Sequence, residues 1–194
     1  MERRAVLLHG TDGSPTELAW QTWLSDQFDA SGYSVCFPQL PECHTPSLKL
    51  YDTFLLDSGW DFANNVLVGH SSGATAVLHL LQQDRFPHVR AVTLVGTFLN
   101  ERLLNAAEWY VPGQFDNLFV ETIEAEKIKH KSDRYYFVHG DDDPYCDYNE
   151  AKELCGELGG TFIPMSGAGH IAKSANIAAL PDVANRLKRD GILD

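Results

Sequence analysis

The sequence predicts an α/β fold with a doubly wound, mostly parallel sheet of six strands and helices on both faces. Two observations predict it. Short apolar runs of strand length alternate with longer segments of helical periodicity, and runs such as Val66-Leu67-Val68 are apolar without a break. Such strands are typical of a parallel sheet covered by helices on each side, and right-handed crossovers then make the sheet doubly wound.

The N-terminal part of the chain alternates strands with helices. Ser14, Pro15 and Glu17 have the spacing of a capping box at the start of the first helix, with Ser14 as the N-cap. Gly32 supplies the signal that ends this helix. The predicted strands are residues 5–9, 34–37 and 65–69, and the predicted helices are residues 14–31, 48–56 and 72–83.

The C-terminal part continues the alternation after one interruption. Residues 100–133 lack a clear period and are rich in aromatic side chains, so we expect a short, cap-like excursion over one edge of the sheet. The 194 residues suit a single domain. The predicted strands are residues 91–96, 135–139 and 161–164, and the predicted helices are residues 149–158 and 180–188.

Charge and cysteine usage narrow the classes of partner. The formal net charge is −12 and no run of Lys or Arg forms a basic stripe, so we expect neither nucleic acid nor an anionic membrane as partner. The four cysteines form no CxxC pair and predict reduced thiols in the cytoplasm.

The apolar run near Met1 has four residues, too few for a signal peptide or a membrane span. Oligomeric state has no signal in the sequence.

The sharpest motif is Gly-His-Ser-Ser-Gly at residues 69–73, where a buried strand turns into a helix. A nucleophile elbow needs this layout, because the serine takes a strained backbone conformation and the residues two positions away must be small. The pattern presents the Ser71 hydroxyl at a helix N-terminus. Ser71 is therefore the predicted nucleophile.

A serine hydroxyl needs a base, and the base needs a carboxylate that fixes its tautomer. His170 follows the last predicted strand on a glycine-rich loop and is the predicted base. The carboxylate comes from Asp141, Asp142 or Asp143, which follow the preceding strand. Asp143 is favoured because the proline after it holds its backbone extended. The order serine, aspartate, histidine is the one that this type of elbow requires.

An oxyanion formed at the substrate carbonyl needs backbone donors. We expect the N–H of Ser72, the residue after the nucleophile, and the N–H of Thr11 on the loop after the first strand, with Asp12 as the alternative to Thr11. Trp109, Tyr110 and Tyr145 are candidate walls of a substrate pocket. Packing within the cap and core is an equally good interpretation of these rings.

Two further patterns point elsewhere. Residues 167–172 match a relaxed GxGxxA dinucleotide fingerprint, but no strand follows that could complete the βαβ unit. The acidic turn 141–143 is followed by Pro144 and Tyr145 where a calcium loop needs a ligand and a glycine. We therefore expect neither a cofactor nor a metal.

The motifs together resemble the α/β-hydrolase superfamily. The resemblance rests on the His9-Gly10 loop, the elbow at 69–73, Asp143-Pro144 and Gly169-His170, and it spans residues 5–170. In size and layout the chain is similar to the small serine hydrolases grouped with retinoblastoma-binding protein 9 and bacterial YdeN. The resemblance implies an α/β-hydrolase fold with a minimal cap and a triad of Ser71, Asp143 and His170.

The resemblance does not extend to a retinoblastoma-type partner. Binding of that kind suggests a Leu-x-Cys-x-Glu motif, and this chain has Leu-Cys-Gly-Glu at residues 154–157. The predicted activity is hydrolysis of a carboxylic ester, a thioester or a small amide through an acyl-enzyme, with a small acyl compound as substrate. The alternatives are a protein-interaction module with a slow or vestigial site and an acyltransferase that uses the same triad.

Overall fold

The computed structural model describes residues 2–104, 107–119 and 122–194. Its centre is a six-stranded sheet in which every neighbouring pair of strands is parallel. The strands are β1 (Arg3–Leu8), β2 (Tyr33–Cys36), β3 (Val66–His70), β4 (Ala91–Val95), β5 (Tyr135–Gly140) and β6 (Thr161–Met165). Their order across the sheet is β2-β1-β3-β4-β5-β6. The predicted fold class is confirmed, and all six strands of this sheet run in the same direction.

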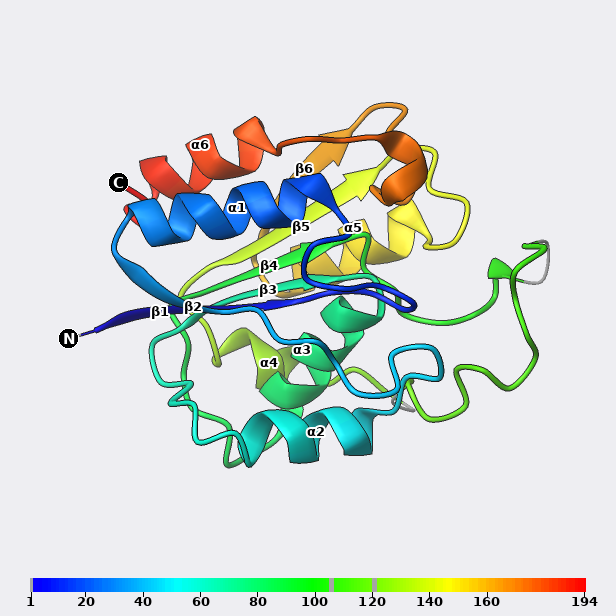
Figure 1. Ribbon diagram of the computed structural model, residues 1–194, viewed down its shortest axis with the longest axis horizontal. Coiled ribbons are helices and arrows are strands. Elements are labelled where there is room, and N and C mark those ends of the chain that lie inside the picture. The colour runs from blue at the N-terminus through cyan, green and yellow to red at the C-terminus, as the bar shows by residue number, and fades with distance from the viewer. Residues whose placement is uncertain (1, 105–106, 120–121) are drawn as a thin grey trace.

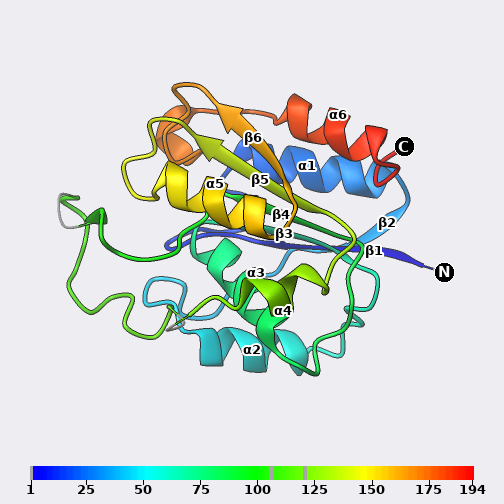
Figure 2. The ribbon, with the colours of Figure 1, turned by 180° about the vertical axis from the view of Figure 1, so that it is seen from behind.

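Helices cover both faces of this sheet (Figures 1 and 2). The helices are α1 (Ala19–Ala30), α2 (Leu48–Leu56), α3 (Ser72–Gln82), α4 (Ala125–Lys129), α5 (Tyr148–Glu157) and α6 (Pro181–Arg189), with a 3-10 turn η2 at Lys173–Ala175. Helices α1 and α6 pack on one face, and α2, α3, α4 and α5 contribute to the core on the other. No helix in the described ranges has the length and apolarity that crossing a membrane requires.

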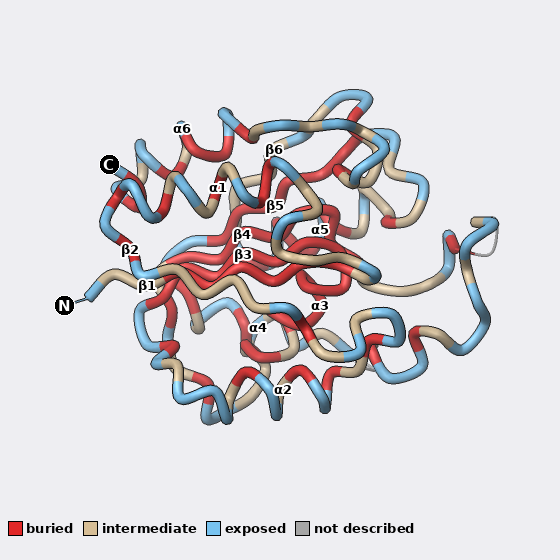
Figure 3. The backbone as a smooth tube through the Cα atoms, viewed as in Figure 1, coloured by how far each residue is buried: buried red, intermediate tan, exposed pale blue. Residues whose placement is uncertain are grey.

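The side chains of the unbroken apolar strands pack into two separate cores, one on each face of the sheet. In β3, Val66 and Val68 join the core under α1 and α6, whereas Leu67 joins the core around α3. Successive side chains of a strand point to opposite faces, so a strand buried on both faces must be apolar at every position. The tube in Figure 3 accordingly shows the central strands as buried along their length. This packing fixes the strand ends from which the site is built.

The predicted start of the first helix is wrong. Helix α1 begins at Ala19, its N-cap is Leu18, and no side chain caps it. The N–H of Glu17 donates instead to the carbonyl of Ser14 in a separate turn, at 3.2 Å. The apolar face of the helix begins at Trp20, which is 1% exposed. Tertiary burial therefore sets the start of the helix and overrides the local capping signal.

The described part of the predicted excursion at 100–133 contains a short helix, α4, that the sequence did not predict. Helix α4 carries Ile128 into the core, and the Tyr135 hydroxyl donates to the carbonyl of Ile128. Residues 105–106 and 120–121 of the excursion lie outside the described residues. The green segment after β4 in Figure 1 extends past the carboxyl ends of the strands. Its described part supplies most of the apolar wall of the site below.

Candidate functional site

Ser71 lies at the junction of β3 and α3 with φ 53° and ψ −123°. A non-glycine residue adopts such a conformation only where its surroundings enforce it. The N–H of Ser71 donates to the carbonyl of Val95 at 3.0 Å. The two flanking glycines allow the turn: a Cβ on Gly69 would come within 2.6 Å of the carbonyl oxygen of Gly73, and one on Gly73 within 2.5 Å of the carbonyl oxygens of Leu8 and His9. The packed backbone thus holds Ser71 in this strained conformation.

The structure brings three of the predicted side chains into one hydrogen-bonded line. The Oγ of Ser71 lies 2.8 Å from the Nε2 of His170, and the Nδ1 of His170 lies 2.8 Å from an oxygen of Asp143. A carboxylate only accepts, so Nδ1 carries the proton and Nε2 is left to accept the hydroxyl proton of Ser71. The arrangement suits removal of a proton from a serine nucleophile.

Asp143 is buried behind the imidazole, and its side chain is 0% exposed. Its second oxygen accepts from the N–H groups of Tyr145 and Cys146, at 2.9 and 3.1 Å. Burial raises the pKa of the Asp143 carboxyl, but the hydrogen bond and charge of His170 and the two amide donors lower it more. The net pKa lies below the ordinary value, so the carboxylate stays ionised behind the ring.

The two neighbouring aspartates serve the same site in another way. Asp141 accepts from the N–H of Gly167 at 2.8 Å, and Asp142 accepts from the N–H of Gly169 at 2.7 Å. Both bonds join the loop after β5 to the loop that carries His170. From the sequence, these two aspartates were only the alternatives to Asp143 for the carboxylate behind the base. Loop-to-loop contacts of this kind have no signature in the local sequence.

The two residues expected to supply the oxyanion donors, Thr11 and Ser72, are in direct contact. The Thr11 hydroxyl donates to the Oγ of Ser72 at 3.0 Å, which links the loop after β1 to the start of α3. Neither the N–H of Thr11 nor that of Ser72 has an acceptor among the described residues. The N–H of Asp12 already donates to the carbonyl of Cys43 at 3.2 Å. Thr11 is therefore the better candidate of the two.

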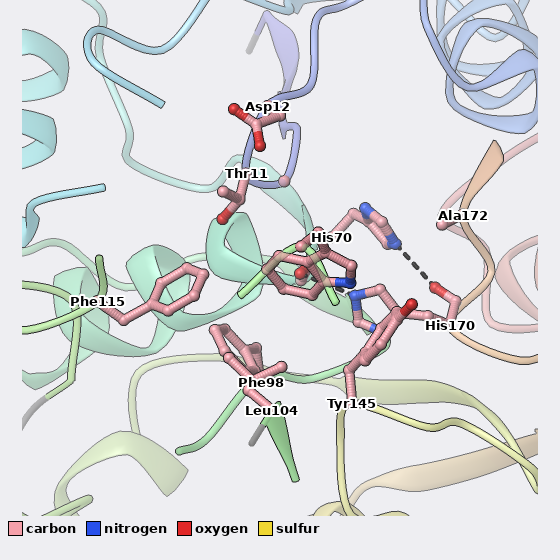
Figure 4. Close-up of a pocket in the computed structure, with 12 residues that line it drawn as sticks. Thr11, Asp12, His70, Phe98, Leu104, Phe115, Tyr145, His170 and Ala172 are labelled. Atoms are coloured by element: carbon pink, nitrogen blue, oxygen red, sulfur yellow. Dashed lines mark hydrogen bonds between the residues drawn. The ribbon is translucent and has the colours of Figure 1, made fainter. Parts of the chain in front are cut away.

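His9 and His70 support the site although neither was predicted to do so. The Nε2 of His9 accepts from the N–H of Leu40 at 2.9 Å, and its Nδ1 lies 2.8 Å from the carbonyl oxygen of Gly10. His70 donates from Nε2 to the carbonyl of His170 at 3.0 Å (Figure 4). Burial, with the nearby His170 ring second, lowers the pKa of His70 to about 3. A neutral His70 therefore fastens the backbone of the proposed base.

Cys146 adds a buried thiol to the same cluster. Its Sγ lies 3.5 Å from the carbonyl oxygen of Gly96 and 3.6 Å from the Nδ1 of His170. Donor atoms of Asp143, Cys146 and His170 lie within 4.8 Å of one another, as a metal site would require. The carboxylate and imidazole are already bonded to each other, however, and burial raises the pKa of the Cys146 thiol. A protonated thiol is a poor metal ligand.

Beside Ser71 lies a cavity of about 150 Å³, which we call the acyl cavity. Of the rings predicted to line a pocket, Trp109 and Tyr145 contribute to its wall. Tyr110 lies outside the lining, because its hydroxyl donates to Glu101 at 2.8 Å. Phe98, Leu104 and Phe115 complete the apolar wall and were not predicted (Figure 4). An aperiodic segment gives no signal that selects these residues.

Comparisons with known proteins agree with this fold. A family model described as serine hydrolase matches residues 5–189. No curated protein matches the chain by sequence.

Solved structures provide likenesses in fold. The ydeN gene product of B. subtilis is 21% identical with a TM-score of 0.82, over 96% of this chain and 97% of that one. A putative YdeN-like hydrolase of Pectobacterium atrosepticum is 17% identical with a TM-score of 0.69, over 100% of this chain and 94% of that one. An esterase domain from a Rhodothermus marinus protein is 18% identical with a TM-score of 0.66, over 96% and 87%.

Proposed function

Because the chain belongs to the serine hydrolase family, we propose that it cleaves carboxylic esters of short-chain acids, with Ser71 as nucleophile, His170 as base and Asp143 as its partner. One observation carries the proposal. Two consecutive hydrogen bonds of 2.8 Å join the three side chains, and the serine sits in the strained backbone conformation of an elbow. Such geometry is what acyl transfer by a serine requires.

The reaction follows from the proton positions. The Oγ of Ser71 forms a bond to the carbonyl carbon while its proton passes to the Nε2 of His170. The imidazolium, steadied by the Asp143 carboxylate, then gives this proton to the alcohol oxygen as the ester bond breaks. Water attacks the acyl-serine in the second half, and His170 again takes and returns a proton. The carboxylic acid leaves and free Ser71 is restored.

The negative charge on the substrate oxygen needs donors that are in place before the reaction. The N–H groups of Thr11 and Ser72 are the candidates, because neither has an acceptor among the described residues and the hydroxyls of these residues hydrogen-bond each other. The N-terminus of α3 contributes a partial positive charge at the same place. The proposed oxyanion site thus lies on the side of Ser71 that faces the loop after β1.

The acyl cavity limits the acid part of the substrate. Its volume of about 150 Å³ is below the roughly 300–1,000 Å³ of drug-sized ligand sites, and its wall is mostly aromatic and aliphatic. A short, uncharged acyl chain suits this space. An ester rather than another acyl compound is also the substrate class in the printed name of the esterase domain that shares the fold.

A fluorophosphonate probe and a panel of chromogenic esters test the proposal. We expect covalent labelling of Ser71, located by peptide mass spectrometry, and hydrolysis of acetate and butyrate esters that falls with longer acyl chains. An unlabelled Ser71 together with an inert ester panel would contradict the proposal and favour an interaction module. Transfer of the acyl group to added alcohols in preference to water would instead indicate an acyltransferase.

A further inference from the structure

A second cavity, of about 130 Å³, also borders the loop formed by residues 9–13, and we call it the polar cavity because most of its lining residues are polar. It is bounded by the first turns of α1 and by Ala172 and Lys173. Gly10, Thr11, Asp12, His70 and Ala172 line both the acyl cavity and the polar cavity, so the two spaces adjoin. In Figure 4, Ala172 lies on the opposite side of His70 from Phe115 and Phe98. The mechanism proposed above leaves this space without a role.

Gln21 is the most unusual residue of the polar cavity. It is 0% exposed, yet neither its Oε1 nor its Nε2 has a hydrogen-bond partner among the described residues. A buried amide without partners destabilises a fold, and nearly all buried polar groups are paired. Within the described part of the chain the amide of Gln21 therefore lacks a partner, and a group that enters the cavity would supply one.

His70 adds an acceptor to the same cavity. Its Nε2 donates to the carbonyl of His170, so the Nδ1 of the neutral ring is an acceptor, and it too is buried without a partner among the described residues. Gly10 packs against this atom, and a Cβ on Gly10 would come within 3.1 Å of it. Gly10 therefore places no side chain between the Nδ1 of His70 and the cavity that both residues line.

These atoms define the ligand. The Oε1 of Gln21 and the Nδ1 of His70 need donors, whereas the Nε2 of Gln21 needs an acceptor. Neighbouring hydroxyl groups supply both, since each hydroxyl donates and accepts. The Lys173 ammonium lies 3.6 Å from the Glu17 carboxylate, and Asp12 adds a second negative charge, so this lining does not favour an anion. A cation, in turn, offers no acceptor to the Nε2 of Gln21. The volume of about 130 Å³ is small beside the roughly 300–1,000 Å³ of drug-sized ligand sites, which suits a glyceryl-sized group.

We propose that the polar cavity binds the alcohol part of the substrate, and that this alcohol is a small polyol held by Gln21 and His70. This inference rests on the proposed function, because it assigns the two adjoining cavities to the two parts of one ester. The acid part occupies the apolar space and the polyol occupies the polar one. When the ester bond breaks, the polyol oxygen takes the proton from His170 and the polyol leaves through its own cavity.

Glyceryl monobutyrate and n-propyl butyrate test the inference on the wild-type protein, since they share the acid and differ in two hydroxyls. We expect kcat/KM for the glyceryl ester to exceed that for the propyl ester by roughly ten- to hundredfold, because each unpaired buried group penalises the wrong ligand. Gln21→Met removes the amide at nearly constant length and should bring this ratio toward one. Gln27→Met, on the same helix but outside the cavity, should leave the ratio as in the wild type.

Each outcome separates the inference from the proposed function. Equal rates on the two esters with Ser71 labelled by the fluorophosphonate would overturn the inference alone, and water would then satisfy Gln21 and His70. Labelling of Ser71 with no turnover of either ester would overturn it as well. A Gln21→Met protein that keeps the wild-type ratio would do the same. Failure of the probe to label Ser71 would end the proposed function, and the inference with it.

Discussion

Two regions of the molecule hold their residues in different ways. One is the carboxyl ends of the parallel strands, which we call the edge, and the other is the segment of residues 97–133 that follows β4, which we call the covering segment. At the edge, backbone hydrogen bonds tie each strand end to the next: Ser71 to Val95, and Gly96 to Val138. The described part of the covering segment instead relies on ring contacts, such as Phe98 against Phe115 at 5.1 Å. Figure 3 shows the strands buried and much of this segment exposed or intermediate.

The residues proposed for catalysis and the residues that line the acyl cavity are therefore held mainly by different kinds of contact. Interstrand bonds are short, numerous and geometrically fixed, so residues at the strand ends hold their positions to within the tolerance that proton transfer needs. Packed apolar side chains, by contrast, tolerate exchanges that conserve volume. We expect substitutions at the edge to abolish turnover and substitutions in the covering segment to change the choice of substrate.

The largest effect should come from Ser71→Ala, which removes the nucleophile. We expect kcat for a short-chain ester to fall by about 10⁴-fold or more. The measurement is hydrolysis of a chromogenic butyrate ester, with the melting temperature as a check on folding. Ser25→Ala on α1 is the matched control. A Ser71→Ala protein that retains wild-type turnover would remove the nucleophile from position 71.

Asp143→Asn tests whether the buried carboxylate has a role that its neighbours lack. The substitution keeps the shape but removes the charge behind the imidazole and permits the wrong tautomer, so we expect a loss in kcat of about 10³- to 10⁴-fold. Asp141→Asn and Asp142→Asn weaken only the loop contacts and should cost roughly tenfold or less. Similar losses in all three variants would show that the acidic turn acts only as a structural unit.

The sequence singled out residues at the strand ends that the structure places in hydrogen-bonding contact, because the topology constrains where they lie. An elbow serine, an acid after the next-to-last strand and a histidine after the last strand converge wherever the strands are parallel and in this order. The pre-proline position also favoured Asp143, which is the aspartate that the structure places against His170. The family resemblance is confirmed by the family model over residues 5–189.

The remaining features depend on contacts that no local pattern encodes. Phe98 and Phe115 meet only after the covering segment has folded back over the edge, and this segment lacks the period that marks a buried face. Gln21 follows a buried tryptophan on α1, and a glutamine in a helix is more often solvated than enclosed. Ser14 carried a valid capping pattern, but the packing of Trp20 decided where α1 begins.

Trp109→Ala tests the covering segment directly. The Trp109 ring forms part of the wall of the acyl cavity and packs on Tyr145, with ring centroids 5.2 Å apart, while its side chain remains partly exposed. Removing it lengthens the cavity, so we expect the ratio of kcat/KM for octanoate over acetate esters to rise about tenfold, in line with one to three kcal/mol for a changed apolar contact. An unchanged ratio would place the acyl chain elsewhere.

The smallest effect concerns stability in acid, and it again falls on the sheet edge. His9, His70 and His139 lie buried at the ends of β1, β3 and β5, whereas His130 in the covering segment is exposed. Burial lowers the pKa of each of the three below its ordinary value of 6.5. Below that pH the unfolded chain binds more protons than the folded chain, so stability must decline as the pH falls.

For His70, whose pKa falls from 6.5 to about 3, this loss approaches about 1.4 kcal/mol for each pH unit within that interval. The free energy of unfolding in urea, measured between about pH 7.5 and about pH 5, should decrease accordingly. His139→Phe, whose new ring can pack beside Phe162, should reduce the slope, and His130→Asn should not. Equal stability across this range would mean that the buried imidazoles bind protons as readily in the folded chain as in the unfolded chain. That result would contradict the prediction, because burial disfavours the charged imidazolium.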